Sequence, residues 1–269
     1  MRAIVLVLLA GCGRLNFQPI DVTDTGTIVD GQPIVTVDSS SNAPVTLTGI
    51  YAISGNGVDP TSVVTIDITT GDVATVGQLP GSLGVLGGLA YWNANTLYAA
   101  GRNYFIKITL APFSAEIAAM TSPDEIAGLE TEGQYLTAVD ASNPMLLIYD
   151  PTTFPAPTVK PLAISVAGGD IAPSTFGGAY YFSNAAHALY AVYTPTGNSL
   201  IVGTAGTESA VQGMFSLNNL AQYYVTESDL DAIIPIDITN GAFGTPIPLC
   251  HPCPGTRYDL LFGDAAAAP

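Results

Sequence analysis

The stretch Gly87-Gly88-Leu89-Ala90-Tyr91-Trp92-Asn93-Ala94-Asn95-Thr96-Leu97-Tyr98-Ala99-Ala100-Gly101 predicts two short apolar strands joined by a polar turn. Residues 90–92 form the first strand and residues 96–100 the second. Asn93 and Asn95 suit the turn, because asparagine tolerates the left-handed backbone of a tight hairpin. Weaker copies of this unit recur along the chain, so we take it as the unit from which the fold is built.

A second pattern fixes the period of the repeat. It reads apolar–x–apolar–Asp–x–Thr–x–Gly and is best preserved in residues 65–71 and 235–241. Its Asp, or the residue in its place, lies at positions 67, 109, 150, 194 and 237, so successive copies are 41 to 44 residues apart. Asp and Thr side chains cap nearby backbone N–H groups, and Gly accepts a positive φ. We therefore interpret these residues as structural turn formers.

Four short apolar runs occur in each repeat, and this predicts an all-β propeller of four-stranded blades. The repeat resembles bacterial NHL-type and related quinoprotein-like propellers over residues 49–264. The first repeat lacks an inner strand, and residues 258–262 form an inner strand with nothing after it. We therefore expect five blades, closed by the C-terminal strand joining the first blade. Two alternatives stay open: a further divergent blade that uses residues 34–37, or an open array.

The amino terminus has the pattern of an export signal. Arg2 precedes a short apolar run that ends in Leu9-Ala10-Gly11-Cys12. This resembles the lipobox of bacterial lipoproteins, which implies cleavage before Cys12, a diacylglyceryl thioether on its sulfur and an acyl group such as palmitate on the new amine. The alternative is an ordinary signal peptide with an incidental cysteine.

A lipid-anchored domain follows from this resemblance. Two or three acyl chains on Cys12 would hold the protein firmly in a membrane. Gly13, where an Asp would favour the inner membrane in enterobacteria, points to the outer membrane of the cell envelope. The expected divisions are a signal peptide at 1–11, a lipidated N-terminus and flexible tether at 12–48, the propeller at 49–264 and a disordered tail at 265–269.

The remaining cysteines form the pair Cys250-His251-Pro252-Cys253 in the loop before the predicted closing strand. Export favours a local disulfide that stiffens this loop. A redox or metal role is the alternative. No helix pattern follows the pair, as a thioredoxin-like motif requires, and the chain has only two histidines to complete a zinc site.

The excess of acidic over basic residues excludes one class of partner. The chain has 6 Lys and Arg against 22 Asp and Glu, for a formal net charge of −16. Such a surface repels phosphate backbones, so we expect no nucleic-acid partner. We expect a monomeric domain with an envelope protein or glycan as partner.

The sequence contains none of the common nucleophile-elbow, zinc-protease, phosphate-loop or dinucleotide-binding motifs. We therefore favour a non-enzymatic binding or scaffold module that uses no cofactor. The alternative is a metal-dependent, lactonase-like envelope hydrolase, which would draw carboxylates from the inner strands of several blades. Its candidate ligands are Glu130, Asp170 and Asp259.

Overall fold

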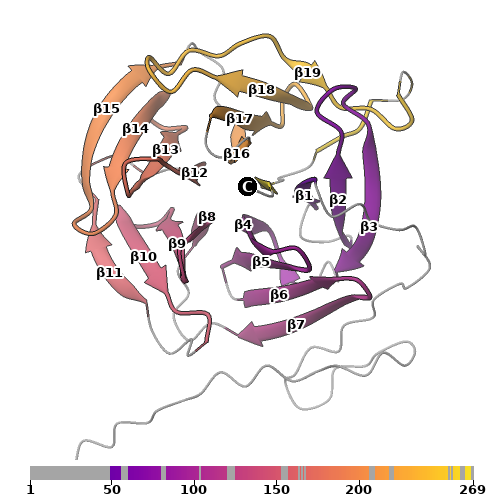
Figure 1. Cartoon of the computed structure of the whole chain (residues 1–269), viewed down its shortest axis with the longest axis horizontal. Coiled ribbons are helices and arrows are strands. Elements are labelled where there is room, and N and C mark those ends of the chain that lie inside the picture. Colours follow the sequence, from indigo (N-terminus) through magenta and orange to yellow (C-terminus); the bar gives the residue numbers. More distant parts are fainter. Residues whose placement is uncertain are drawn as a thin grey trace, which may run out of the picture.

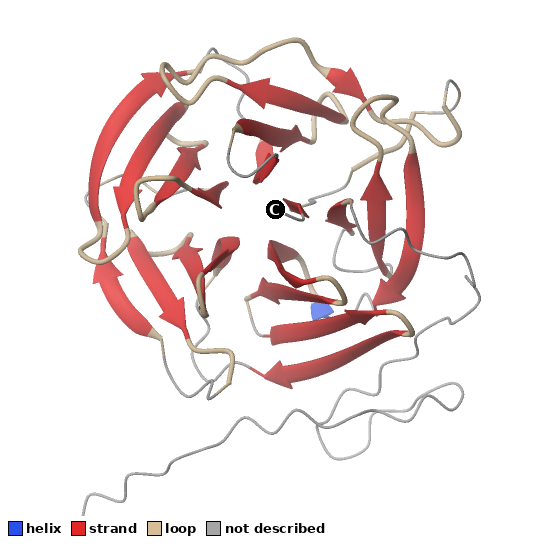
Figure 2. Ribbon diagram, viewed as in Figure 1, coloured by secondary structure: helices blue, strands red, loops and turns tan. Residues whose placement is uncertain are grey.

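The protein is a propeller of five antiparallel blades around a central axis (Figures 1 and 2). The structure is a computed structural model and describes residues 49–55, 60–79, 83–102, 104–119, 125–152, 157–162, 164, 166, 168–205, 210–217, 221–253, 255, 257–260 and 264–267. The leader, Cys12, the tether and the run at 34–37 lie outside these ranges. The described residues contain no α-helix and no helix long and apolar enough to cross a membrane.

Each blade has four strands, which follow one another from the axis outward. Blade 1 is β20 (Ala265–Ala267), β1 (Ile50–Ser54), β2 (Thr61–Ile66) and β3 (Val73–Leu79); blade 2 is β4 (Leu86–Asn93), β5 (Thr96–Gly101), β6 (Tyr104–Leu110) and β7 (Phe113–Ala119); blade 3 is β8 (Ile126–Glu132), β9 (Tyr135–Asp140), β10 (Met145–Tyr149) and β11 (Thr158–Pro161); blade 4 is β12 (Gly169–Pro173), β13 (Ala179–Ser183), β14 (Ala188–Tyr193) and β15 (Asn198–Thr204); blade 5 is β16 (Val211–Leu217), β17 (Gln222–Glu227), β18 (Ala232–Ile236) and β19 (Ile247–Pro248).

Five hydrophobic clusters fill the spaces between neighbouring blades. Alternate side chains of a strand face opposite sides of a sheet, so each blade contributes to two clusters. In β1, Tyr51 packs into the cluster shared with blade 2, whereas Ile50 packs into the cluster shared with blade 5. Because a blade buries its faces only against neighbours, the ring has to close.

The Asp–x–Thr motif forms the expected turns between the third and fourth strands. The Asp67 Oδ1 atom accepts hydrogen bonds from the amide of Thr69 at 2.8 Å and from its hydroxyl at 2.6 Å. The pairs Asp150–Thr152 and Asp237–Thr239 repeat this arrangement. The Asp67 and Asp237 pKa values are lowered by these hydrogen bonds, first of all by the one from the threonine hydroxyl. The structural interpretation of these residues is confirmed.

The turn glycines also fix the spacing of the blades. Gly71, Gly197 and Gly241 have φ values of 75–76°. Each lies against the outer strand of the preceding blade: a Cβ would overlap the backbone of Pro248 at Gly71 and of Pro161 at Gly197, and would make a tight contact with Gly203 at Gly241. Glycine at these positions therefore serves both the turn and the contact between blades.

The structure confirms that a C-terminal strand closes the ring by joining blade 1, but this closing strand is β20 and not the segment predicted from the sequence. β20 pairs with β1, with Ile50 opposite Ala267 and Ala52 opposite Ala265 (Figure 1). The strand expected at 258–262 does not close the ring: residues 258–260 are irregular, and 261–262 lie outside the described ranges. Of the tail expected to be disordered, residues 265–267 form β20, and 268–269 lie outside the described ranges. Ala265 and Ala266 are buried because neighbouring blades cover both faces of the closing strand: Ala265 packs into the cluster shared with blade 5 and Ala266 into the cluster shared with blade 2.

Candidate functional site

The inner strands bring one equivalent residue from each blade to the axis. The strand registers align Gly88, Gly128, Asp170, Gly213 and Asp264 at this position. Three are glycines and two are aspartates. A Cβ on Gly128 would overlap the Asp170 carboxylate, so the small residues make room for the acidic ones.

The two aspartates are bound to backbone amides of the next blade. Asp170 Oδ2 accepts a hydrogen bond from the amide of Met214 in blade 5. Asp264 Oδ2 accepts one from the amide of Leu89 in blade 2, and Asp264 Oδ1 accepts one from the amide of Ala265 at 2.6 Å. The carboxyl groups thereby join the inner strands of neighbouring blades.

The two carboxyl groups also interact with each other. Both side chains are buried, and Asp170 Oδ1 has no partner when both groups are treated as acceptors. Burial raises the pKa of both groups well above the usual range, and the Asp264 charge and the hydrogen bond with Asp264 raise the pKa of Asp170 further. A single shared proton satisfies both, because a protonated carboxyl donates to an ionised one.

Glu130 lies two residues beyond Gly128 on β8. Its Oε1 atom accepts a hydrogen bond from the amide of Thr131 at 2.6 Å. Part of the side chain reaches solvent, yet burial of the carboxyl group is the main cause of its strongly raised pKa, with the Asp264 and Glu132 charges adding to it. Glu132 is held by hydrogen bonds from the hydroxyls of Thr137 at 3.2 Å and Thr194 at 2.6 Å.

The three carboxylates that the sequence predicted as metal ligands therefore do not meet at one point. Asp170 reaches the axis and Glu130 lies close enough to Asp264 for their charges to interact. Asp259 is exposed, and its backbone carbonyl accepts a hydrogen bond from Ser54 at 3.4 Å. Sequence reasoning missed Asp264, which takes the axial place because the closing strand begins at residue 265. Among the described residues, no group of three or more His, Cys, Asp and Glu side chains is arranged to hold a metal ion.

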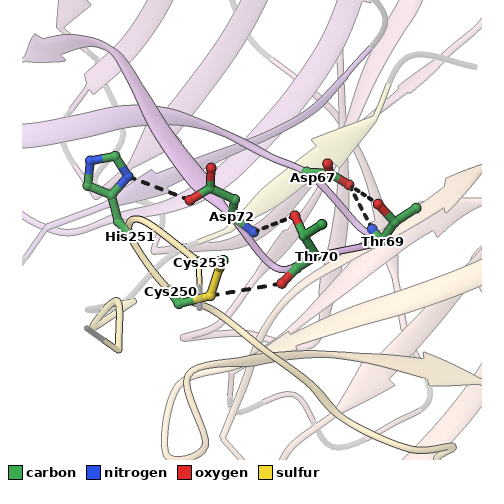
Figure 3. Close-up of a disulfide and its surroundings, with 7 residues drawn as sticks. All are labelled: Asp67, Thr69, Thr70, Asp72, Cys250, His251 and Cys253. Carbon is green, nitrogen blue, oxygen red and sulfur yellow. Dashed lines mark hydrogen bonds and ion pairs between the residues drawn. A yellow bond between two sulfur atoms is a disulfide. The ribbon is translucent and has the colours of Figure 1, made fainter. Parts of the chain in front are cut away.

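The cysteine loop forms a second closure of the ring, because it lies beside the turn of blade 1 that contains Thr70 and Asp72 (Figure 3). Cys250 and Cys253 are joined by a disulfide, with their Cα atoms 5.2 Å apart. The Cys250 amide donates to the Gly71 carbonyl at 3.0 Å, and the Val73 amide donates to the Cys250 carbonyl at 3.0 Å. His251 lies 3.7 Å from Asp72. The loop after blade 5 is thus docked on the outer turn of blade 1.

Comparisons with known proteins support the propeller fold alone. No protein-family model matches the sequence, and no curated protein matches it. A chain in the crystal structure of a nidogen/laminin complex is similar, with a TM-score of 0.53 and 11% identity over 82% of this chain and 99% of that chain. A structural genomics protein of unknown function from Bacteroides thetaiotaomicron has a TM-score of 0.52 and 14% identity over 86% of this chain and 66% of that chain.

Proposed function

We propose that this protein is a lipid-anchored propeller of the bacterial cell envelope that acts as a non-enzymatic binding or scaffold module for an envelope protein or glycan. The observation that carries the non-enzymatic part is the use made of the axial carboxyl groups. Asp170 and Asp264 are buried and bonded to backbone amides of neighbouring blades. These hydrogen bonds join the inner strands of neighbouring blades, which is a structural use of the two carboxyl groups.

The anchoring part is supported by the lipobox at Leu9-Ala10-Gly11-Cys12. Its test is fractionation of a Gram-negative host that expresses the full chain with its own leader. We expect the wild-type chain in the outer-membrane fraction with a mass increase that maps to Cys12. Cys12→Ser should move the chain to the soluble fraction, whereas a Cys250→Ser/Cys253→Ser control should stay with the membrane. A Cys12→Ser chain that stays in the membrane fraction would contradict the anchor.

A metal-dependent envelope hydrolase is the second candidate, because two carboxyl groups do meet at the axis and Asp170 Oδ1 lacks a partner unless a proton or cation lies between them. Metal content and melting of the full chain with and without EDTA separate the two candidates. A stoichiometric ion whose removal lowers the melting temperature, and which Asp170→Asn abolishes, would favour the hydrolase. An unchanged melting temperature favours the binding module.

A further inference from the structure

The exposed phenylalanine and tyrosine side chains that the structure describes lie at adjoining turns of blades 3 and 4. Tyr135 is 41% exposed at the start of β9, Phe176 is 44% exposed in the β12–β13 turn, and Tyr193 is 47% exposed at the end of β14. Thr194 joins the two blades here, because its hydroxyl donates to Glu132 at 2.6 Å and Glu132 pairs with Tyr135. We call the three exposed rings the aromatic patch.

Phe176 is held in place by rings that lead back to the core. Its ring meets that of Tyr180 edge-on with the centroids 5.4 Å apart, and Tyr180 meets Tyr223 edge-on at 5.3 Å. Tyr223 is buried, and its hydroxyl donates to the Pro173 carbonyl at 2.9 Å. Gly178 leaves room for this arrangement, because a Cβ there would lie 2.6 Å from the Phe176 ring. A side chain supported in this way loses little conformational entropy when a ligand covers it.

Tyr193 lies on the same face of blade 4 as Phe176. Tyr180, which contacts the Phe176 ring, pairs with Ala191 across β13 and β14. Paired residues share a face of the sheet, and so do alternate residues of a strand, so Tyr193 follows Ala191 on that face. Two exposed rings therefore lie on one side of blade 4, and Tyr135 lies on the neighbouring turn of blade 3.

The turns that carry the patch contain no charged residue. They read Gly-Gln at 133–134, Ser-Thr-Phe-Gly-Gly at 174–178 and Thr-Pro-Thr-Gly at 194–197. Both oxygens of the adjacent Glu132 accept hydrogen bonds from threonine hydroxyls. Exposed amide and hydroxyl groups accompany the rings, namely those of Gln134, Thr175 and Thr196. The rim of the patch is thus neutral and rich in hydrogen-bonding groups.

Area and charge decide between the classes of occupant. Three half-exposed rings present about 200–300 Å² of aromatic surface, whereas a stable protein interface takes about 800 Å² from each partner. The formal charge of −16 opposes phosphorylated sugars, acidic sugars and anionic lipid surfaces. A neutral oligosaccharide fits both conditions, because its apolar ring faces pack on aromatic side chains while its hydroxyls bond to the neutral rim.

We propose that the aromatic patch binds a neutral oligosaccharide, with Phe176 and Tyr193 as the side chains on which its sugar rings stack. This inference rests on the proposed binding function and selects a glycan as its ligand. The binding surface is then formed by turns at the blade edge, whereas Asp170 and Asp264 at the axis serve the fold.

Calorimetric titration of the full chain carrying Cys12→Ser tests the site, with neutral hexaoses of glucose, mannose and N-acetylglucosamine as probes. We expect one of them to bind, and a hexaose of galacturonic acid to bind more weakly because of its charge. Phe176→Ala and Tyr193→Ala should each lower the affinity about tenfold, since each removes the contact area of a ring. Tyr193→Phe keeps the ring and should stay within about twofold of the wild-type affinity.

Leu200→Ala, at a 71% exposed position outside the patch, is the matched control and should leave the affinity unchanged. All of these variants should keep the wild-type melting temperature, because the substituted side chains are exposed. The glycan assignment is overturned if no neutral hexaose binds at about 10 mM, if binding survives Phe176→Ala/Tyr193→Ala, or if Leu200→Ala causes an equal loss.

The proposed function has a separate readout in the Cys12-dependent fractionation. A wild-type chain that stays with the outer membrane but binds no hexaose overturns the glycan assignment and leaves the anchored scaffold. A chain whose fractionation does not depend on Cys12 contradicts the anchor, whatever the titration gives.

Discussion

Asp170 and Asp264 show how two acidic residues can stabilise the centre of a strongly acidic protein. An isolated buried carboxylate is costly, but in this ring each group accepts a hydrogen bond from a backbone amide, and we infer that the pair shares one proton. The shared proton turns a repulsion into a hydrogen bond between blade 4 and blade 1. Because of this proton, the stability of the folded chain depends on pH.

The pH dependence follows from the direction of the pKa shifts. Both folded-state pKa values lie above the value of about 3.9 for an unfolded aspartate, so the folded chain keeps a proton that the unfolded chain has lost. Stability from the pair is fully present below pH ~4 and falls as the pH rises toward the folded-state pKa, by at most about 1.4 kcal/mol per pH unit for each proton. Raised pKa values of Glu130 and Glu227 add a dependence of the same sign.

Asp170→Asn should weaken this dependence. The amide keeps the shape of the carboxyl and donates permanently to Asp264, so we expect a smaller loss of stability between pH 5 and pH 8 (about one proton less) and a higher melting temperature at neutral pH. Chemical denaturation across that range measures the slope. Asp259→Asn removes the same charge at an exposed position and should leave the slope unchanged. Equal slopes in wild type and Asp170→Asn would mean that the pair holds no shared proton.

At the scale of elements, the sequence predicts those features that depend on neighbouring residues. The Asp67–Thr69 turn closes within a few residues, so its side-chain pattern is sufficient to predict it. β20 was missed because Ala-Ala-Ala has no strand preference of its own. It is a strand because β1 offers an edge with which these residues pair. Asp264 was missed as well, because the group that it binds lies in a blade that is distant in the sequence.

The disulfide loop is the element that fastens blade 5 to blade 1 at the outside. Its loop of four residues limits the chain-entropy effect of the bond to about 2 kcal/mol. Cys250 makes backbone hydrogen bonds with Gly71 and Val73 at the start of this loop, so we expect these bonds to weaken when the disulfide is removed.

Cys250→Ser/Cys253→Ser should therefore lower the free energy of unfolding by about 1–2 kcal/mol and loosen the outer closure. Hydrogen exchange should quicken at the amides of Cys250 and Val73, while the Leu89 and Met214 amides at the axis stay protected. Reduction of the wild-type chain should give the same pattern. Protection that is unchanged at Val73 would show that the loop docks on blade 1 without its disulfide.

At the scale of the whole molecule, the ring has two closures, and we expect the inner one to contribute more to its stability. β20 completes blade 1, buries Ala265 and Ala266 between neighbouring inner strands, and brings Asp264 to both Leu89 and Asp170. Its loss would leave β1 with an unpaired edge and Asp170 buried without its partner. Unlike an open repeat array, in which each unit depends only on its neighbours, a closed ring has no end at which unfolding can stop.

Deletion of residues 264–269 should therefore destabilise all five blades together, by several kcal/mol, because it removes a buried strand and unpairs a buried carboxyl group. Deletion of Ala268 and Pro269 alone is the matched control and should leave the melting curve unchanged. Asp264→Asn, which keeps the strand and a hydrogen-bonding side chain, should fall between the two. Hydrogen exchange measured along the chain shows which strands lose protection after the deletion. Loss of protection in β8, β12 and β16 as well as in β1 and β4 is expected for a cooperative ring, whereas loss confined to β1–β3 would mean that the blades unfold as separate units and that closure contributes only to blade 1.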